Sequence, residues 1–340
     1  MNVFVYEHIT SGALINESLP ASLAHEGNQM LAAIVHDMAL LKDIKLLILR
    51  DSRLEPLSEI NICAGYQCIV IDNERAFKQH YTDSVKEADA VIIIAPETDE
   101  LLQNLQQSVL NHNTLLLGCR PTATHICSDK IICYQQLLSN NVVTPHTISA
   151  NEWSQNSFNS STGFVVKPLA GAGCIDTLFF ADSSAVTTYL TSSSLDLNKI
   201  IIQAYIEGNA ISLSILCDDQ ASRVLAINQQ HIQLKDGQLS FQGCTVNGTT
   251  EIQFNLNQAT TIADKTHHAI PGLWGFIGID LIVTDNESYV VDINPRITTS
   301  YVGLHQSLNV NPAQLLLTMV EYGFSALPLN FQRDAIEITI

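Results

Sequence analysis

The sequence is poor in basic residues, and it has no apolar segment long enough to span a bilayer. Lys and Arg total 16 against 34 Asp and Glu, so the formal net charge is −18. Nucleic-acid-binding proteins usually carry a basic patch, and none is found in this sequence. No apolar run reaches the roughly 18 residues of a membrane helix, and the N-terminus lacks the basic region and cleavage motif of a signal peptide. We therefore expect a cytoplasmic protein with no nucleic-acid or membrane partner.

Three motifs that would assign a function directly are also missing. The eight cysteines form no C-x-x-C pair, which suits reduced thiols better than disulfides or a zinc site. Cys63 and Cys68, and the adjacent His267 and His268, lack zinc-ligand spacing, so we interpret them as structural. No G-x-G-x-x-G opens a helix in the first third of the chain, and no Gly-Lys-Ser/Thr follows a glycine loop. The sequence therefore supports neither a dinucleotide fingerprint nor a P-loop.

What is present is an alternation of apolar strands and helices, with 46% hydrophobic residues over 340 positions. Residues 1–118 read as strands at 2–7, 45–51, 68–72, 88–97 and 113–119 with helices between them, which predicts a parallel, Rossmann-like α/β domain. Residues 119–198 contain a helix over 128–140, a polar loop over 153–163 and a strand over 163–168. From 199 to 340 strands dominate, and a late helix begins near Asn311 and Pro312. We expect these three ranges to be domains or subdomains of an α/β and α+β protein.

The last strand pair carries an acidic face. If the turn between the strands 276–283 and 288–294 centres on Asn286, Asp280 lies directly opposite Asp292, and Asn294 shares their face. Two carboxylates at that range repel unless a cation lies between them, and three hard oxygen ligands suit Mg²⁺. The alternative is that both aspartates are solvated on an exposed face. Arg296 favours the metal site, because a guanidinium beside it matches a phosphoryl group.

Two lysines and a glycine loop precede this hairpin. Lys167 ends a strand and is followed by Gly171 and Gly173, whose lack of a Cβ lets backbone amides approach phosphate oxygens. Lys130 opens a helix. The apolar stretch 203–206 can hold an adenine through its backbone and side walls. Each feature has a plainer alternative when it is taken alone. The glycine loop can be an ordinary turn, Lys130 a surface lysine, and 203–206 part of a core strand.

Taken in order, these motifs resemble the ATP-grasp superfamily. The resembling residues are S-D-K at 128–130, V-V-K-P at 165–168 with A-G-A-G, Q-A-Y-I-E-G at 203–208, G-I-D at 278–280 and D-I-N-P-R at 292–296. The resemblance implies the ATP-grasp fold with an N-terminal pre-ATP-grasp domain, and it implies ATP and Mg²⁺ or Mn²⁺ as cofactors. It assigns ATP to Lys130, Lys167, Gly171, Gly173, Gln203, Ala204, Tyr205 and Ile206, with Glu207 as a ribose candidate, and the metal to Asp280, Asp292 and Asn294. The family norm is Glu-x-Asn-x-Arg, so Asp292 is a departure that shortens one ligand.

Segments outside the core, such as 5–14 and 293–303, resemble the tyramine–L-glutamate ligase group. This implies a carboxylate–amine ligase that phosphorylates a carboxylate and lets an amine displace phosphate, with Arg296 stabilising the developing charge. L-Glutamate joined to tyramine or tyrosine, in a methanofuran-like cofactor pathway, is the expected reaction. Such ligases are commonly dimers, which allows a homodimer here. The substrate candidates are Glu7, Glu26, Thr298, Thr299, Ser300 and Tyr301.

Three alternatives stay open. A ligase of the same family acting on other amino acids has the same motifs. A nucleotide-binding regulatory protein with an altered metal site is favoured by Asp292 alone. A nicotinamide-dependent oxidoreductase could use Asp51 as its ribose ligand, but it lacks the glycine fingerprint.

Overall fold

A computed structural model describes residues 1–57, 65–171, 173–192, 195–249 and 254–340 of the chain. Its N-terminal part is built on a five-stranded parallel sheet, as the alternating pattern predicts. The strand order is β3-β2-β1-β4-β5, with bounds Tyr66–Ile71, Lys45–Asp51, Asn2–Glu7, Ala90–Ile94 and Leu115–Leu116. The order reverses direction beside β1, so the carboxyl ends of β1 and β4 border the crevice where ligands bind in such sheets.

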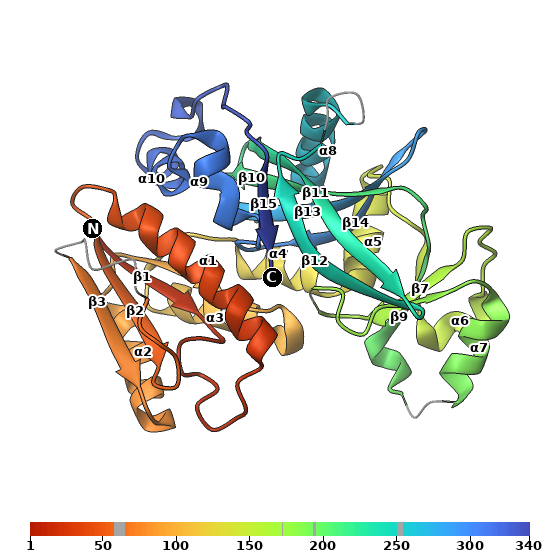
Figure 1. The fold of residues 1–340 in the computed structure, drawn as a ribbon, viewed down its shortest axis with the longest axis horizontal. Helices are drawn as coiled ribbons and strands as arrows, with labels where there is room; N and C mark the ends of the chain where they lie inside the picture. Colours follow the sequence, from red (N-terminus) through yellow and green to blue (C-terminus); the bar gives the residue numbers. More distant parts are fainter. Residues whose placement is uncertain (58–64, 172, 193–194, 250–253) are drawn as a thin grey trace.

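Helices cover both faces of this sheet (Figure 1). Helix α1 (Ala21–Ala39) packs Met30, Ile34 and neighbouring side chains against Val3 and Val5 of β1. The alternate residues of β1, Phe4 and Tyr6, pack in a second cluster with side chains of α2 (Glu74–Glu87) and α3 (Leu101–Asn111). This two-sided burial follows from the two-residue period of a strand, and it explains why residues 3–6 of β1 are all hydrophobic.

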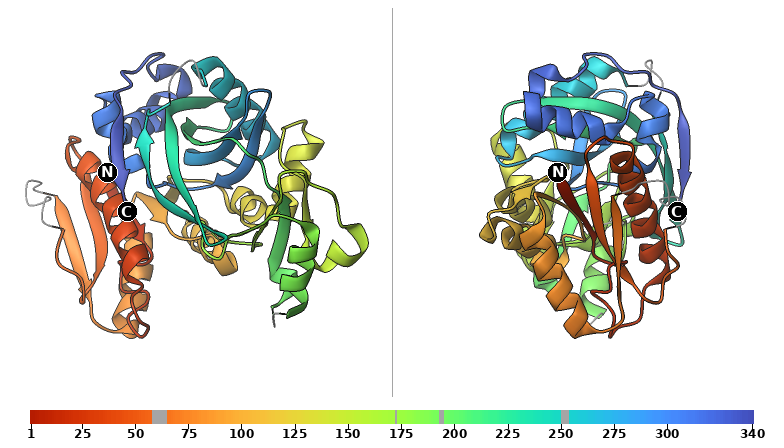
Figure 2. Two further views of the ribbon diagram at one scale, coloured as in Figure 1. Left: turned by 45° about the vertical axis from the view of Figure 1, so that its right-hand side comes forward. Right: turned by 90° about the vertical axis from the view of Figure 1, so that its left-hand side faces the viewer.

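Most of the remaining strands form a second, antiparallel sheet that is strongly curved (Figure 2). Its main path begins at the two strands of the acidic hairpin and ends with four short strands from residues 147–204. In spatial order these strands are β14 (Ser288–Asn294), β13 (Gly275–Val283), β10 (Asn209–Cys217), β11 (Ser222–Lys235), β12 (Gln238–Val246), β8 (Leu178–Phe180), β7 (Phe164–Pro168), β9 (Ile200–Ala204) and β6 (Thr147–Ser149). Strand β15 (Ile336–Thr339) pairs with β12. Because Gln238 of β12 pairs with Leu178 of β8, the sheet is continuous across the expected boundary at 198, and the three domain limits stay a prediction.

Seven α-helices lie outside the first sheet domain within the described residues. They are α4 (Pro121–Ser128), α5 (Lys130–Ser139), α6 (Trp153–Asn156), α7 (Ser183–Ser192), α8 (Leu256–Ala269), α9 (Tyr301–Leu308) and α10 (Pro312–Tyr322). The Asp129 carboxylate accepts hydrogen bonds from the amides of Ile131 and Ile132, both at 2.9 Å, so Asp129 caps α5. Asn311 caps α10 in the same way, one residue before Pro312.

Two sequence expectations need correction. The segment 153–163 is not loop throughout, because Trp153 begins a short helix that buries its indole against Phe164. Strands β12 and β15 and helix α8 were not expected at all. In none of the described helices is an apolar segment long enough to cross a membrane.

Candidate active site

A cleft of about 840 Å³ separates α1 and the carboxyl end of the first sheet from the inner face of the second. Its lining includes all but two of the residues that the sequence assigned to ATP, metal or substrates. Those present are Glu7, Glu26, Lys130, Lys167, Gly171, Gly173, Gln203, Ala204, Tyr205, Ile206, Asp280, Asp292, Asn294, Arg296, Thr298, Thr299 and Ser300. Residues more than 290 positions apart in the chain therefore share one cavity.

The acidic hairpin has the expected pairing at its functional end. Asp280 lies opposite Asp292, and Gly278 lies opposite Asn294. A β-bulge next to this pair shifts the register by one residue, so Leu281 pairs with Val290 and the turn is not centred on Asn286. The expected register was therefore correct for the carboxylates and wrong toward the tip of the hairpin.

Asp280 is held by two amide donors. Gln230 Nε2 donates to its Oδ1 at 2.8 Å, and Asn294 Nδ2 donates to its Oδ2 at 3.1 Å. Burial, with the nearby charge of Asp292, raises the pKa of Asp280 to about 6. Ionising this buried carboxyl group beside Asp292 costs free energy, and a bound cation would remove that cost.

Both lysines lie at this acidic pair. Lys130 Nζ is 3.0 Å from Asp292 Oδ2 and also donates to the carbonyl of Gly171 at 3.2 Å. Lys167 Nζ donates at 3.5 Å to the carbonyl of Val291, the bulged residue. Burial acts to lower the pKa of Lys130, but the charge and hydrogen bond of Asp292, together with the charge of Glu97, outweigh it and the pKa is raised. Burial lowers the pKa of Lys167, and the charge of Lys130 adds to this effect.

The donor set fits a hard divalent cation. Asp280 and Asp292 supply two opposed carboxylates, and Asn294 supplies an amide whose oxygen is not the atom bonded to Asp280. The ammonium of Lys130 already contacts this set, so the site accepts positive charge. Carboxylate and amide oxygens without His or Cys favour Mg²⁺ or Mn²⁺ over zinc.

The glycine loop and strand β9 form the other end of the cleft. Gly173 has φ +67, a left-handed conformation that favours glycine; residue 172 lies outside the described residues. Strand β9 ends at Ala204, where the amides of Ala204 and Tyr205 donate to the carbonyls of His146 and Gly163. Tyr205 and Ile206 therefore line the cleft just beyond the strand.

At the α1 side the cleft is acidic. Glu7 is buried and accepts hydrogen bonds from the amides of Ile9 (3.1 Å) and Thr10 (2.7 Å), while burial raises its pKa. Glu26 on α1 accepts a hydrogen bond from the hydroxyl of Thr299. A Cβ at Gly27 would lie 2.7 Å from the Glu7 carboxyl carbon, so glycine is what allows α1 to approach β1 here.

Two predicted site residues are not brought to the cleft. Tyr301 is 2% exposed, and its hydroxyl donates to Asp37 of α1 at 2.9 Å. It lies in the first turn of α9, where it joins two domains instead of facing a substrate. Glu207 is exposed and does not line the cavity.

Two residues at the site were not predicted from the sequence. Glu97, three residues beyond the end of β4, binds Arg296 through Oε1 to Nε at 2.8 Å and through Oε2 to Nη2 at 3.4 Å. The available signal was an acidic residue beyond the carboxyl end of a buried strand, the usual position of ligand-site residues in parallel sheets. Gly27 was also missed, although a glycine inside a helical pattern is a recognised signal of close packing.

The oxidoreductase alternative loses its ribose ligand. Asp51 is fully buried and is occupied by Arg53, whose Nε and Nη2 donate to it at 2.9 and 2.7 Å. His267 Nε2 contacts the carbonyl of Asp218 at 2.7 Å, as a structural histidine would. Cys63 lies outside the described residues.

Comparison with known proteins agrees with this geometry. A family profile described as "ATP-grasp domain" matches residues 127–300, which is more than half of the chain, and one described as "pre ATP-grasp 3 domain" matches 44–124. The chain is 26% identical to tyramine–L-glutamate ligase of Methanocaldococcus fervens over 284 residues, covering 83% of each protein. It is 26% identical over 172 residues to D-alanine–D-alanine ligase of Petrotoga mobilis, covering 49% of this chain and 56% of that protein.

Solved structures agree on the fold. An ATP-grasp superfamily protein from Archaeoglobus fulgidus superposes with a TM-score of 0.68 at 22% identity, covering 93% of this chain and 88% of the other. L-Amino acid ligase from Bacillus licheniformis superposes with a TM-score of 0.61 at 16% identity, covering 96% and 76%. On the family profile and the fold, the chain belongs to the ATP-grasp family.

Proposed function

We propose that the protein is an ATP-dependent carboxylate–amine ligase that works through an acyl phosphate. The observation that carries this proposal is the meeting of Asp280, Asp292, Lys130, Lys167 and Arg296 on one cleft. Positive side chains from α5, from β7 and from the segment after β14 lie around an opposed carboxylate pair there. Phosphoryl transfer needs positioning and charge neutralisation more than covalent help, and this arrangement supplies both.

In the proposed reaction a substrate carboxylate oxygen attacks the terminal phosphorus of ATP, and ADP leaves. The amine nitrogen then attacks the carbonyl carbon of the acyl phosphate, the C–O bond breaks, and phosphate leaves as the nitrogen loses a proton. Lys130 and Lys167 bind phosphate oxygens, and Arg296 stabilises the charge on the transferred group. A Mg²⁺ or Mn²⁺ ion held by Asp280, Asp292 and Asn294 would neutralise phosphate charge. Glu7 and Glu26 bind the amine.

The substrates that we propose are L-glutamate and an amine with an apolar body, such as tyramine or tyrosine. Two directly opposed apolar pairs, Ile232–Phe241 and Leu234–Leu239, line the cleft on the β11–β12 hairpin. Leu234 is 46% exposed, which leaves apolar surface for a ligand to cover. The names of the relatives support this pair of substrates, and the M. fervens enzyme spans most of the chain. A cofactor-pathway role, a cytoplasmic location and a homodimer stay predictions.

A ligase for other amino acids is the second candidate. It is favoured by the likeness to D-alanine–D-alanine ligase, whose match overlaps the ATP-grasp region. The cleft chemistry would be the same, and the difference would lie in which side chains the apolar hairpin and the acidic α1 side accept. A regulatory nucleotide-binding protein would bind ATP here without turnover.

The test is an ADP-release screen over carboxylates and amines with Mg²⁺, followed by product masses. Hydroxylamine replaces the amine in a parallel series, because it traps an activated carboxylate as a hydroxamate. We expect ADP release and hydroxamate with L-glutamate, and an amide with tyramine or tyrosine. Hydroxamate with another amino acid would select the second candidate. Tight ATP binding without ADP release from any pair would support the regulatory protein and overturn the ligase.

A further inference from the structure

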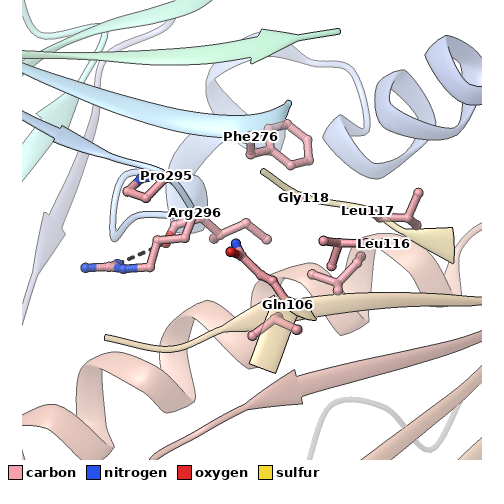
Figure 3. A pocket seen from close by; sticks show the side chains of 10 residues that line it. Gln106, Leu116, Leu117, Gly118, Phe276, Pro295 and Arg296 are labelled. Carbon is pink, nitrogen blue, oxygen red and sulfur yellow. Dashed lines mark hydrogen bonds between the residues drawn. The ribbon is translucent and has the colours of Figure 1, made fainter. Parts of the chain in front are cut away.

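Arg296 lines the cleft and is hydrogen-bonded to Glu97, so the two residues connect the two sheets. It follows β14, whereas Glu97 follows β4 of the first sheet, 199 positions earlier in the chain. Figure 3 shows the guanidinium pointing away from Gln106 and Phe276 and bonded to the backbone beside it. That bond runs from Nη1 to the carbonyl of Ile297 at 3.1 Å.

Counting donors shows what this arrangement leaves for a ligand. A guanidinium has five N–H donors. Glu97 takes one from Nε and one from Nη2, and the Ile297 carbonyl takes one from Nη1. One donor on each terminal nitrogen remains. Two donors in a fixed fork are what a phosphoryl or carboxylate group accepts.

Glu97 acts from behind the cleft surface. It is 5% exposed and does not line the cavity, whereas Arg296, Pro96 and Thr98 do. Burial acts to lower the pKa of Arg296, but the charge and hydrogen bond of Glu97, together with the charges of Glu26 and Asp280, outweigh it and the pKa is raised. Glu97 therefore fixes the position of the Arg296 side chain without lining the cleft itself.

The backbone just after Glu97 adopts an unfavourable conformation. Asp99 and Glu100 are consecutive non-glycine residues with φ of +52° and +59°. Both conformations are unfavourable for residues with a Cβ, compared with the right-handed region. A costly turn at this position fits a requirement for one orientation of the Glu97 carboxylate.

We propose that Glu97 is a positioning residue that aims Arg296 at the transferred phosphoryl group. The inference rests on the role given to Arg296 in the proposed function. Since the two residues belong to different sheets, the arginine is aimed only when the N-terminal domain is docked. The N-terminal domain would thereby contribute to phosphoryl transfer through a residue that never touches substrate.

The test is a double-mutant cycle with Glu97→Gln, Arg296→Lys and the double variant, because Lys keeps the charge and loses the fork. We expect Glu97→Gln to lower kcat about 10- to 100-fold with the KM for ATP changed less than about twofold. The double variant should be no slower than Arg296→Lys alone. Glu97→Asp should restore part of kcat. Losses that multiply in the double variant would overturn the proposal.

His305→Gln is the matched control, because it removes another link between the domains, the contact of His305 Nδ1 with Asp37 at 2.5 Å. A purely structural role for Glu97 predicts equal effects of Glu97→Gln and His305→Gln on melting temperature and on kcat. Our proposal predicts a kcat loss for Glu97→Gln alone. Equal kcat losses would reduce Glu97 to a domain contact.

A binding measurement separates failure of this proposal from failure of the ligase function. ADP with aluminium fluoride mimics a phosphoryl group in transfer, and calorimetry can compare it with ADP alone without any known substrate. We expect Glu97→Gln and Arg296→Lys to weaken the fluoride complex by the same factor and to leave ADP binding unchanged. An unchanged fluoride complex in Glu97→Gln, or no gain from fluoride in the wild type, would contradict the positioning role even if a substrate pair is found.

Discussion

Lys130 Nζ lies 3.0 Å from Asp292 Oδ2, so a proposed phosphate ligand and a proposed metal ligand are direct partners. Both side chains are largely buried, with 10% and 22% of their surface exposed. Such a pair loses little on exchanging one partner for another of the same charge, whereas removing one partner leaves the other uncompensated. Nucleotide phosphate would replace Asp292 as the partner of Lys130, and a divalent ion would replace Lys130 as the partner of Asp292.

Asp292→Ala tests the metal assignment. We expect ADP release to fall at least about 100-fold, because one carboxylate of the metal site is lost and Lys130 is left without its counter-ion. ADP release under saturating Mg²⁺ is the measurement. Asp285→Ala, an exposed change of the same kind at the hairpin tip, should be silent. Full activity of Asp292→Ala would rule out this metal site.

Lys167→Ala tests the nucleotide assignment. Lys167 is in contact with the Val291 carbonyl and lines the cleft, so we expect ATP affinity to fall about 10- to 100-fold, as for loss of a charged hydrogen bond. Calorimetric titration with ATP and Mg²⁺ measures this. Lys199→Ala removes an exposed lysine beyond α7 and should bind normally. Equal affinities of the two variants would place the phosphates elsewhere.

Asp280→Asn should stabilise the metal-free protein at pH 8. The pKa of Asp280 is raised from 3.8 to about 6, so the folded protein is penalised for ionising it, and this penalty builds up between about pH 4 and pH 6 and is complete above that range. We expect a melting temperature about 2–4 °C above wild type at pH 8. The advantage should shrink as the pH falls through 6 and vanish near pH 4. The single oxygen of the new amide can still accept the hydrogen bond from Gln230 Nε2.

Thermal unfolding in a chelating buffer at pH 8 and pH 5 provides this measurement. Adding Mg²⁺ should raise the melting temperature of the wild type and leave that of Asp280→Asn unchanged. A variant that melts below wild type at pH 8 would show that Asp280 is not penalised by ionisation.

Gly27→Ala tests the approach of α1 to β1. The added Cβ would meet the Glu7 carboxylate, which is pinned by the amides of Ile9 and Thr10 and cannot swing aside freely. We expect destabilisation of about 1–3 kcal/mol, as for other overpacked sites, and a higher KM for the amine with the KM for ATP unchanged. Ser22→Ala, exposed on the same helix, is the control. A neutral Gly27→Ala would mean that α1 has room to move.

The sequence by itself determined the fold class, the order of the motifs and the shared face of the hairpin carboxylates, although not every strand and helix. The two-residue period of a strand places Asp280, Asp292 and Asn294 on one side of their hairpin whatever surrounds it. The start of α10 at Asn311 was also readable, because an N-cap depends only on neighbouring backbone amides. The family assignment and the fold class, both confirmed, followed from such local patterns.

The tertiary structure decided which distant residues meet. The bulge at Val291 adjusts the hairpin register without a sequence signal, because a bulge is stabilised by what surrounds it. Glu97 finds Arg296, and Tyr301 turns from the cleft to Asp37, only because the two sheets dock with α1 against α9. Contacts across 199 or 264 positions depend on domain packing, which the period of a strand or a helix does not encode.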